Sequence, residues 1–155
     1  MKKYIIILIL CIIAWGNALY LSYQAYNINQ ATYYGQSVEN ISSFCDVSET
    51  ASCTNVLKHP LSKVFGIPFP VIAAFIYPVL FFLALYWYIS GKILPIKVLA
   101  GMSLGWMMFN GYIIFLETFY IKAFCLLCLL CSLIIISIFI LSLLILKGEK
   151  RKTLI

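Results

Sequence analysis

The chain has 155 residues, of which 64% are hydrophobic and only 10% are charged. A soluble domain of this length does not carry so apolar a composition, so the sequence predicts an integral membrane protein with several spanning helices and one sizeable loop. The net charge of +6 does not indicate a nucleic-acid partner, because the basic residues gather at the ends of the apolar runs, where they act as topology signals.

The first apolar run extends from Tyr4 to Tyr23, directly after two lysines. A basic start, an apolar centre and the small residues at 16–18 are also compatible with a cleaved signal peptide. The run continues past that point to about 20 residues, which is long enough to cross a membrane. We therefore predict an uncleaved spanning helix over residues 4–23, in which Cys11 serves only in packing.

A long polar segment follows, from about residue 24 to residue 67, and we predict an outer loop there. It carries Cys45 and Cys53. Between Val56 and Phe65 the apolar residues recur at helical spacing, which is typical of a short amphipathic helix lying at the membrane surface. Pro60 is expected to break or to start that helix.

Three further apolar runs complete the chain. We predict spans at about residues 68–89, 96–116 and 123–146, with short connections at 90–95 and 117–122. Gly101 and Gly105 in the third span form a Gly-x-x-x-Gly pattern, which permits close contact between membrane helices. The expected fold is all-α, a single membrane domain over residues 1–155 in which four transmembrane helices form a bundle under the outer loop and its short helix.

The distribution of basic residues predicts the orientation of this bundle. Four spans put both termini and the 90–95 connection on one side, with these eight basic residues: Lys2, Lys3, Lys92, Lys97, Lys147, Lys150, Arg151 and Lys152. The other side has three, namely Lys58, Lys63 and Lys122. The positive-inside rule therefore predicts cytoplasmic termini in the cell (inner) membrane and a loop on the periplasmic or extracellular side, where disulfides persist.

The fourth span opens with Cys125-Leu126-Leu127-Cys128. Two cysteines three apart at a helix start can form a redox-active disulfide, because the free N–H groups and the helix dipole stabilise a thiolate. Cys131 makes a second such pair with Cys128 one turn deeper, and cysteines also serve as small packing residues in membrane helices. The outer pair lies nearer to water and to the helix start, so we predict that Cys125 and Cys128 are the redox pair.

Two cysteine pairs on one side of a membrane suggest an electron relay. Thiol–disulfide exchange requires that a thiolate reach a disulfide, which a loop pair can do, and the helix pair can meet an electron acceptor dissolved in the bilayer, such as a quinone. The alternative is a static disulfide between Cys45 and Cys53 in a non-enzymatic membrane protein or transporter subunit. The sequence has no charge in the interior of a predicted span to mark an ion path, since Lys97 lies at the edge of its span, and this argues against the transporter.

Several of these pieces occur together in one known family. The chain resembles the vitamin K epoxide reductase family, particularly its prokaryotic members, in Cys45-x7-Cys53, Val64-Phe65-Gly66-Ile67-Pro68, Tyr77 and Ala123-Phe124-Cys125-Leu126-Leu127-Cys128. The DsbB-type oxidases do similar chemistry but carry their Cys-x-x-Cys in the first outer loop. The order of the pairs is reversed here, which favours the first family.

The resemblance implies a role for each of the four outer cysteines. Cys128 would lie next to the quinone, which would be a ubiquinone, a menaquinone or a related compound. Cys125 would exchange with Cys53, and Cys45 would complete the loop pair that meets an outside partner. Many prokaryotic members carry a fused thioredoxin-like domain; here the partner is expected to be a separate thioredoxin-like protein, and no metal is expected. The direction of electron flow depends on redox potentials, so a reductase working outward is an open alternative.

The chain also departs from the family pattern. His59 stands where the family usually has Ser or Thr, and a His near exchanging thiols can stabilise a thiolate or move protons, although an exposed loop residue is the simpler interpretation. Ser132 stands where animal members use a quinone-binding Tyr, so vitamin K epoxide itself is not favoured as the substrate. Candidate quinone contacts, with ordinary membrane packing as the alternative, are Val56, Leu57, Phe65, Phe69, Ile72 and Ser132.

Overall fold

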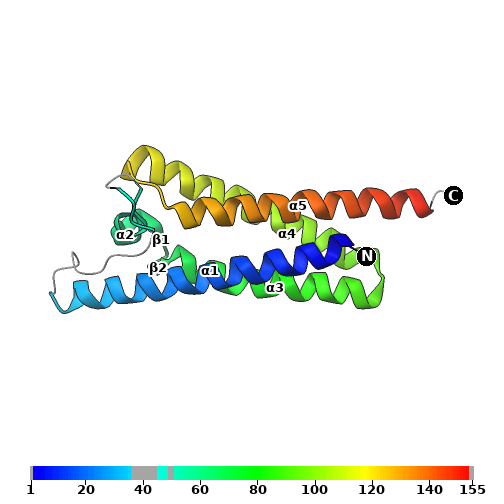
Figure 1. The fold of residues 1–155 in the computed structure, drawn as a ribbon, viewed down its shortest axis with the longest axis horizontal. Coiled ribbons are helices and arrows are strands. Elements are labelled where there is room, and N and C mark those ends of the chain that lie inside the picture. The colour runs from blue at the N-terminus through cyan, green and yellow to red at the C-terminus, as the bar shows by residue number, and fades with distance from the viewer. Residues whose placement is uncertain (1, 36–44, 49–50, 154–155) are drawn as a thin grey trace.

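The computed structural model describes residues 2–35, 45–48 and 51–153. Within these residues the long helices are α1 (Lys2–Tyr33), α3 (Phe69–Ser90), α4 (Ile93–Leu116) and α5 (Leu126–Thr153). They run side by side along the long axis of the molecule, with α1 against α3 and α4 against α5 (Figure 1). Four helical stretches are long and apolar enough to cross a membrane, so the predicted all-α bundle of a multi-pass membrane protein is confirmed.

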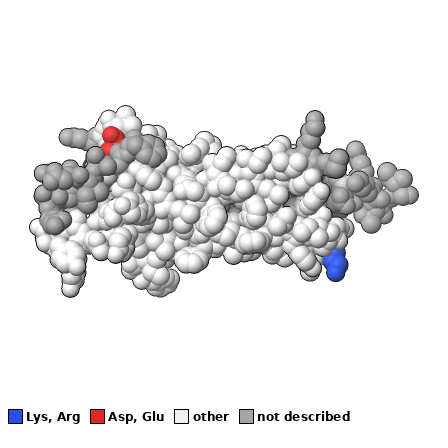
Figure 2. Space-filling model, turned by 60° about the horizontal axis from the view of Figure 1, so that its bottom comes forward, with Lys and Arg blue, Asp and Glu red and all other residues white. Residues whose placement is uncertain are grey.

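The surface of the bundle suits a lipid environment. On the face drawn in Figure 2, charged atoms of the described residues appear only near the two ends of the molecule. Large apolar side chains are exposed along the helices between those ends, for example Ile9 on α1, Phe82 on α3 and Leu133 on α5. In water such exposure would be costly, whereas lipid tails are as apolar as these side chains.

Helix α1 is longer than the sequence indicated. We predicted a helix over residues 4–23 and a loop from residue 24, but the helix continues to Tyr33. The reason is a buried stripe in which steps of four and three alternate: Ile7, Cys11, Ala14, Ala18, Leu21, Ala25 and Ile28. This heptad-like spacing keeps one face of the helix against its neighbours, and it does not stop where the polar residues begin. The remainder of the predicted loop at 36–44 and 49–50 lies outside the described residues.

The two connections between the later helices differ from each other. After α3 the chain turns at Gly91, whose φ of 63° is a left-handed conformation that glycine adopts without strain, and its N–H bonds to the Trp87 carbonyl at 2.9 Å. We predicted a connection at residues 117–122, but after α4 the chain does not leave the helix there. It continues as a π-helical segment, η3 (Glu117–Ile121), and turns only at Lys122.

The Gly-x-x-x-Gly pattern of α4 is not used for packing within the chain. Gly101 and Gly105 are exposed, and no heavy atom lies within 4 Å of a Cβ built on either residue. The close helix contact that the pattern permits is therefore absent from the part of the bundle that the structure describes.

The outer segment forms a compact cap over one end of the bundle (Figure 1). It contains α2 (Cys53–Lys58), the 3₁₀ turn η2 (Pro60–Ser62) and a hairpin of β1 (Lys63–Val64) with β2 (Ile67–Pro68). The short helix exists as predicted but not over 56–65. Its N-cap is Ser52, whose side chain accepts the Asn55 N–H, and it ends at His59, which the following Pro60 holds in an extended conformation.

Phe65 therefore lies in a turn rather than on a helix. Phe65 and Gly66 connect the two short strands with φ values of 53° and 81°, and the Phe65 side chain is fully exposed. The predicted amphipathic helix over residues 56–65 is wrong at this point. The apolar residues of the stretch are divided among a short helix, a turn and a hairpin, so they do not form one face of a single helix.

Candidate active site

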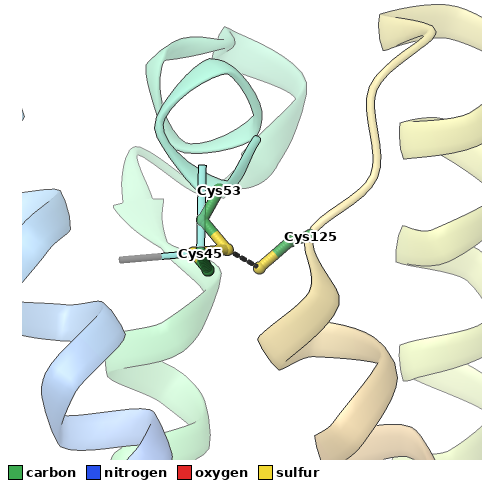
Figure 3. A group of neighbouring side chains, drawn as sticks. All are labelled: Cys45, Cys53 and Cys125. Atoms are coloured by element: carbon green, nitrogen blue, oxygen red, sulfur yellow. Dashed lines mark hydrogen bonds between the residues drawn. A yellow bond between two sulfur atoms is a disulfide. The ribbon is translucent and has the colours of Figure 1, made fainter. Parts of the chain in front are cut away.

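The sulfur atoms of three cysteines meet beneath the cap. Cys45 and Cys53 form a disulfide, and the Cys125 Sγ lies 2.8 Å from the Cys53 Sγ. Figure 3 shows Cys53 at the start of α2, pointing toward Cys125 at the point where the chain enters α5. All three residues are buried. The sequence predicted that Cys53 and Cys125 must be able to touch, and the structure brings them together.

Asp46 holds the loop pair in place. Its carboxylate accepts hydrogen bonds from the Ser52 hydroxyl at 2.7 Å, the Thr54 N–H at 3.1 Å and the Thr54 hydroxyl at 2.6 Å. Ser52 and Thr54 flank Cys53, and Asp46 follows Cys45. The hydrogen bonds between them therefore connect the two segments that the disulfide also joins. A carboxylate at a helix start also interacts favourably with the helix dipole. Sequence reasoning missed Asp46; its place next to a cysteine and before a Ser-x-Thr was the available signal.

A backbone contact joins the cap to the start of α5. Ala51 and Phe124 form an isolated parallel β-bridge. Cys53 and Cys125 follow these two residues along their segments, so the bridge sets the distance between the two thiols. Cys53 and Cys125 are 72 residues apart in the sequence, and no pattern in the sequence predicts the bridge that brings them together.

Cys125 occupies the position that caps α5. Its carbonyl accepts the Leu129 N–H at 3.0 Å, and its Sγ accepts the Cys128 N–H at 3.3 Å. A Ser or Asp oxygen normally accepts such a bond at a helix start. The helix begins at Leu126 rather than Ala123, and one of its first N–H groups, that of Cys128, is directed at the Cys125 sulfur. Cys125 and Cys128 are both free cysteines.

Glu117 is a residue that the sequence analysis left in a connection. It is 1% exposed, and one of its carboxyl oxygens accepts the Cys125 N–H at 3.3 Å. The apolar run of α4 extends through it, so an acidic residue lies within a stretch that can cross the membrane. Its signal in the sequence was an acid at the end of an apolar run, eight residues before the first cysteine of the Cys-x-x-Cys.

Cys131 and Cys11 lie away from the three clustered sulfur atoms. The Asn17 amide on α1 donates to the Cys131 Sγ at 3.0 Å and to the Leu127 carbonyl at 2.9 Å. Cys131 therefore takes part in a contact between α1 and α5, and Cys11 is buried in the heptad-like stripe of α1. Both positions agree with the packing role expected for them.

The predicted quinone contacts lie in different surroundings, although Val56, Leu57 and Phe69 belong to one buried apolar cluster against which Ile72 packs. Val56 and Leu57 are buried in the cap, Ile72 is half-buried on α3, and Phe65 is exposed in the hairpin turn. Phe69 is buried near the start of α3, and its ring stacks on Trp106 of α4 with centroids 5.7 Å apart.

Ser132 has a polar partner that the sequence did not reveal. Its hydroxyl donates to the Asn110 side-chain oxygen at 3.5 Å, and Asn110 is 1% exposed on α4. Buried polar side chains in a membrane bundle are costly unless they are hydrogen-bonded, and they often mark a site. Asn110 lies in the middle of an apolar run, which was the signal that sequence reasoning overlooked.

His59 has a local hydrogen bond in the cap. Its Nδ1 accepts the Leu61 N–H at 3.3 Å, which caps the η2 turn. A contact between His59 and a thiol is not among those recorded for the described residues, so the simpler interpretation of this residue has the geometric support.

An apolar groove of about 300 Å³ opens between α1 and α3. The residues lining it include neither Cys125 nor Cys128, and none of the predicted quinone contacts. They are Cys11, Ile12, Trp15, Tyr77, Pro78, Phe81 and Phe82. The groove therefore does not identify where a quinone would meet the thiols.

The three clustered sulfurs also raise the question of a metal ion. They all lie within 4.8 Å of one another, a spacing at which three sulfur atoms could bind one metal ion. Structural zinc is held by thiolates, however, and in the disulfide form two of these sulfurs are bonded to each other, so only Cys125 can offer a thiolate. A disulfide in contact with a third, capped thiol fits exchange better than metal binding.

A bundle of membrane helices with a disulfide held against a free thiol defines a class: the protein is a membrane thiol–disulfide oxidoreductase. The chain belongs to the vitamin K epoxide reductase family, whose sequence model matches residues 5–143. That range includes the cap and all four cysteines of the two pairs, so the resemblance seen in the sequence is confirmed. No curated protein matches the chain.

Proposed function

We propose that the protein oxidises a separate thioredoxin-like partner on the outer side of the membrane and passes the electrons to a quinone. The observation that carries this proposal is the 2.8 Å contact between the Cys53 and Cys125 sulfur atoms. A structural disulfide needs no third thiol beside it, whereas a relay between two pairs requires one.

The electrons move by successive exchange of disulfides. A partner thiolate attacks Cys45, forms a mixed disulfide and releases Cys53 as a thiolate; the second partner thiol then attacks the mixed disulfide and leaves both loop cysteines reduced. Cys53 next attacks Cys125 of an oxidised Cys125–Cys128 pair and releases Cys128. Finally Cys45 attacks Cys53, which restores the loop disulfide and leaves the helix pair reduced.

The quinone then oxidises the helix pair. Formation of the Cys125–Cys128 disulfide releases two electrons and two protons, which together convert a quinone to its quinol. The observed arrangement, with a Cys45–Cys53 disulfide and free thiols at Cys125 and Cys128, corresponds to the step just before this transfer.

We further propose that the quinone approaches Cys128 from the space between α4 and α5. Ser132 follows Cys128 by about one helical turn, and its bond with the buried Asn110 supplies polar groups that can meet a quinone oxygen. The stacked rings of Phe69 and Trp106 offer a flat apolar surface nearby on α3 and α4. Ser132 stands where animal members have a quinone-binding Tyr, and this difference favours a respiratory quinone over vitamin K epoxide.

The orientation of the bundle is part of the same proposal. The excess of basic residues at the termini supports cytoplasmic ends and an outer cap. In a variant without native cysteines, a single cysteine at Ser43 is expected to react with a membrane-impermeant reagent added outside, and one at Ser90 only after the membrane is opened. Labelling of Ser43 from the inside alone would contradict this orientation.

The function is tested by anaerobic mixing of the purified protein with a reduced thioredoxin-like protein and ubiquinone or menaquinone. Reduction of the quinone with matching oxidation of the partner is the expected result. If the Cys45–Cys53 disulfide resists mild reductant and no quinone is reduced, the protein is a scaffold with a structural disulfide. Starting from a quinol and an oxidised partner tests the outward direction of electron flow.

A further inference from the structure

Glu117 presents an acidic group to the helix pair with half of its hydrogen-bonding capacity unused. The Cys125 N–H donates to one carboxyl oxygen at 3.3 Å. The other oxygen, Oε1, is buried and has no hydrogen-bond partner among the described residues. A buried polar atom without a partner is unusual and costs about 1–3 kcal/mol, so its presence calls for a reason.

The backbone at this point is also unusual. Glu117 is the first residue of η3, a π-helical segment, and the chain leaves this segment through Lys122 in a left-handed conformation with a φ of 56°. Short π-helical segments interrupt the regular stacking of an α-helix and occur frequently at functional sites. Here the segment lies between the end of α4 and the short link that leads to Cys125.

The groups that surround the carboxyl are thiols rather than cations. Glu117 interacts with the Cys128 thiol as well as with the Cys125 backbone. An ion pair with Lys, Arg or His is not recorded for Glu117 in the described part of the chain. The Cys131 thiol on α5 also interacts with Cys128, whereas Cys53, which contacts Cys125 from the cap, is bonded to Cys45 and does not titrate in this form.

A purely structural role does not account for this choice of residue. One oxygen is enough to accept the Cys125 N–H, and a neutral amide would supply it without burying a second, unpaired acidic oxygen. What a carboxyl adds is the capacity to bind and release a proton beside Cys128.

We propose that Glu117 transfers the proton of the Cys128 thiol during each redox cycle. This inference rests on the proposed function. When Cys53 attacks Cys125, the Cys125–Cys128 bond breaks, Cys128 leaves as a thiolate, and the Glu117 carboxyl gives it a proton. When the quinone takes two electrons from the pair, the Cys125–Cys128 bond forms again and the Glu117 carboxylate takes up the Cys128 proton, which restores the carboxyl for the next cycle. The quinol takes the proton that Cys125 loses and one proton from water, which replaces the proton that Cys53 released when it attacked.

The substitution that separates proton transfer from anchoring is Glu117→Gln. The amide oxygen still accepts the Cys125 N–H, but the side chain cannot exchange a proton. Quinone reduction by the reduced protein, followed from about pH 6 to about pH 9, is expected to slow about 100-fold near neutral pH, which is the lower end of the range for general acid–base groups. The deficit shrinks as pH rises, because hydroxide can then remove the thiol proton.

Two control variants keep this test specific. Thr118→Ala changes the neighbouring exposed residue, whose hydroxyl bonds only to the Ile114 carbonyl of its own helix, and is expected to leave the rate unchanged. Glu117→Asp retains an acid on a shorter side chain and is expected to recover part of the rate with the pH profile of the unaltered protein. If the pH profile of quinone reduction by Glu117→Gln has the same shape as that of the unaltered protein, the proposal is overturned, even if the rate itself is lower.

A second measurement does not depend on turnover. Alkylation of Cys128 in the fully reduced protein is followed against pH by mass spectrometry, and its midpoint is expected to shift by about one pH unit in Glu117→Gln, as for two coupled groups. An unshifted midpoint overturns the proposal. A shifted midpoint in a protein that reduces no quinone overturns the proposed function and keeps the proton exchange between Glu117 and Cys128.

Discussion

The two cysteine pairs lie in surroundings of different kinds, although they are equally buried. Cys45 and Cys53 lie in a cap held by side-chain hydrogen bonds to Asp46, at the end of the bundle. Cys125 caps α5 and Cys128 lies in its first turn, and the start of this spanning helix is held by backbone bonds and by Glu117. The loop pair can therefore change position by local opening of the cap, whereas the helix pair can move only with the bundle.

This difference supports the proposed assignment of the two ends of the relay. Cys45 is only 3% exposed, so a protein partner reaches it only when the cap opens. A quinone, by contrast, dissolves in the bilayer and can approach the helix pair from the side. A mobile pair for a protein and a fixed pair for a membrane-soluble acceptor is the arrangement that two-stage exchange requires. The predictions that follow perturb one pair at a time.

The largest effect is expected from loss of a cysteine in either pair. Replacement of any one of Cys45, Cys53, Cys125 or Cys128 by Ser removes a sulfur atom that the exchange needs, so partner oxidation coupled to quinone falls to background. Cys11→Ser and Cys131→Ser are the matched controls and retain most of the activity. An active Cys125→Ser protein would mean that Cys128 and Cys131 form the working pair, contrary to the proposed comparison.

The next prediction joins the two pairs covalently. In Cys128→Ser the Cys125 thiolate can still attack Cys53 and release Cys45, whereas the Cys128 thiol that would displace Cys53 from Cys125 is gone, so the Cys53–Cys125 disulfide is expected to become detectable under oxidising conditions, in equilibrium with the Cys45–Cys53 disulfide. Proteolysis without reductant and mass spectrometry identify it, and the unaltered protein serves as the control. Finding only Cys45–Cys53 linked, with Cys125 free, would leave the two pairs unconnected and favour a structural disulfide.

A change at Asp46 is expected to affect the loop pair alone. Asp46→Ala removes the acceptor of three hydrogen bonds, which destabilises the closed cap by about 2–4 kcal/mol if each is worth about 1 kcal/mol. The Cys45–Cys53 disulfide should then be reduced by dithiothreitol at least about ten times faster, since each 1.4 kcal/mol is tenfold in population. Lys58→Ala, an exposed change on α2, is the control. Unchanged reduction would show that opening of the cap does not limit access.

The smallest effect concerns the helix pair and its acceptor. Ser132→Ala removes one hydrogen-bonding group beside Cys128, so KM for the quinone is expected to rise about 3- to 10-fold, the equivalent of one bond of about 1 kcal/mol. Exchange between the two pairs should be unaffected. Ser137→Ala, whose hydroxyl bonds only within α5, is the control. A slower exchange with unchanged KM would place Ser132 outside the quinone site.

The sequence by itself determined the membrane class, the existence of four spanning helices and the pairing of Cys45 with Cys53. Lipid selects long apolar runs, and each spanning helix satisfies its own backbone bonds, so these features depend on local composition and can be read without a structure. The regular spacing of apolar residues in α1 also continues beyond Tyr23, but the polar residues between them obscured this pattern. In the cap the local signals conflicted, which is why the predicted helix over 56–65 was misplaced.

Only the tertiary structure decided which residues meet. The contact of Cys53 with Cys125, the bridge of Ala51 with Phe124 and the bond of Ser132 with Asn110 join segments far apart in sequence. Glu117 acquired its place beside the helix pair because α4 continues directly into η3 and packs against α5. Such contacts depend on how the helices pack against each other and how the cap folds over their ends, and neither is encoded in the period or composition of any one segment.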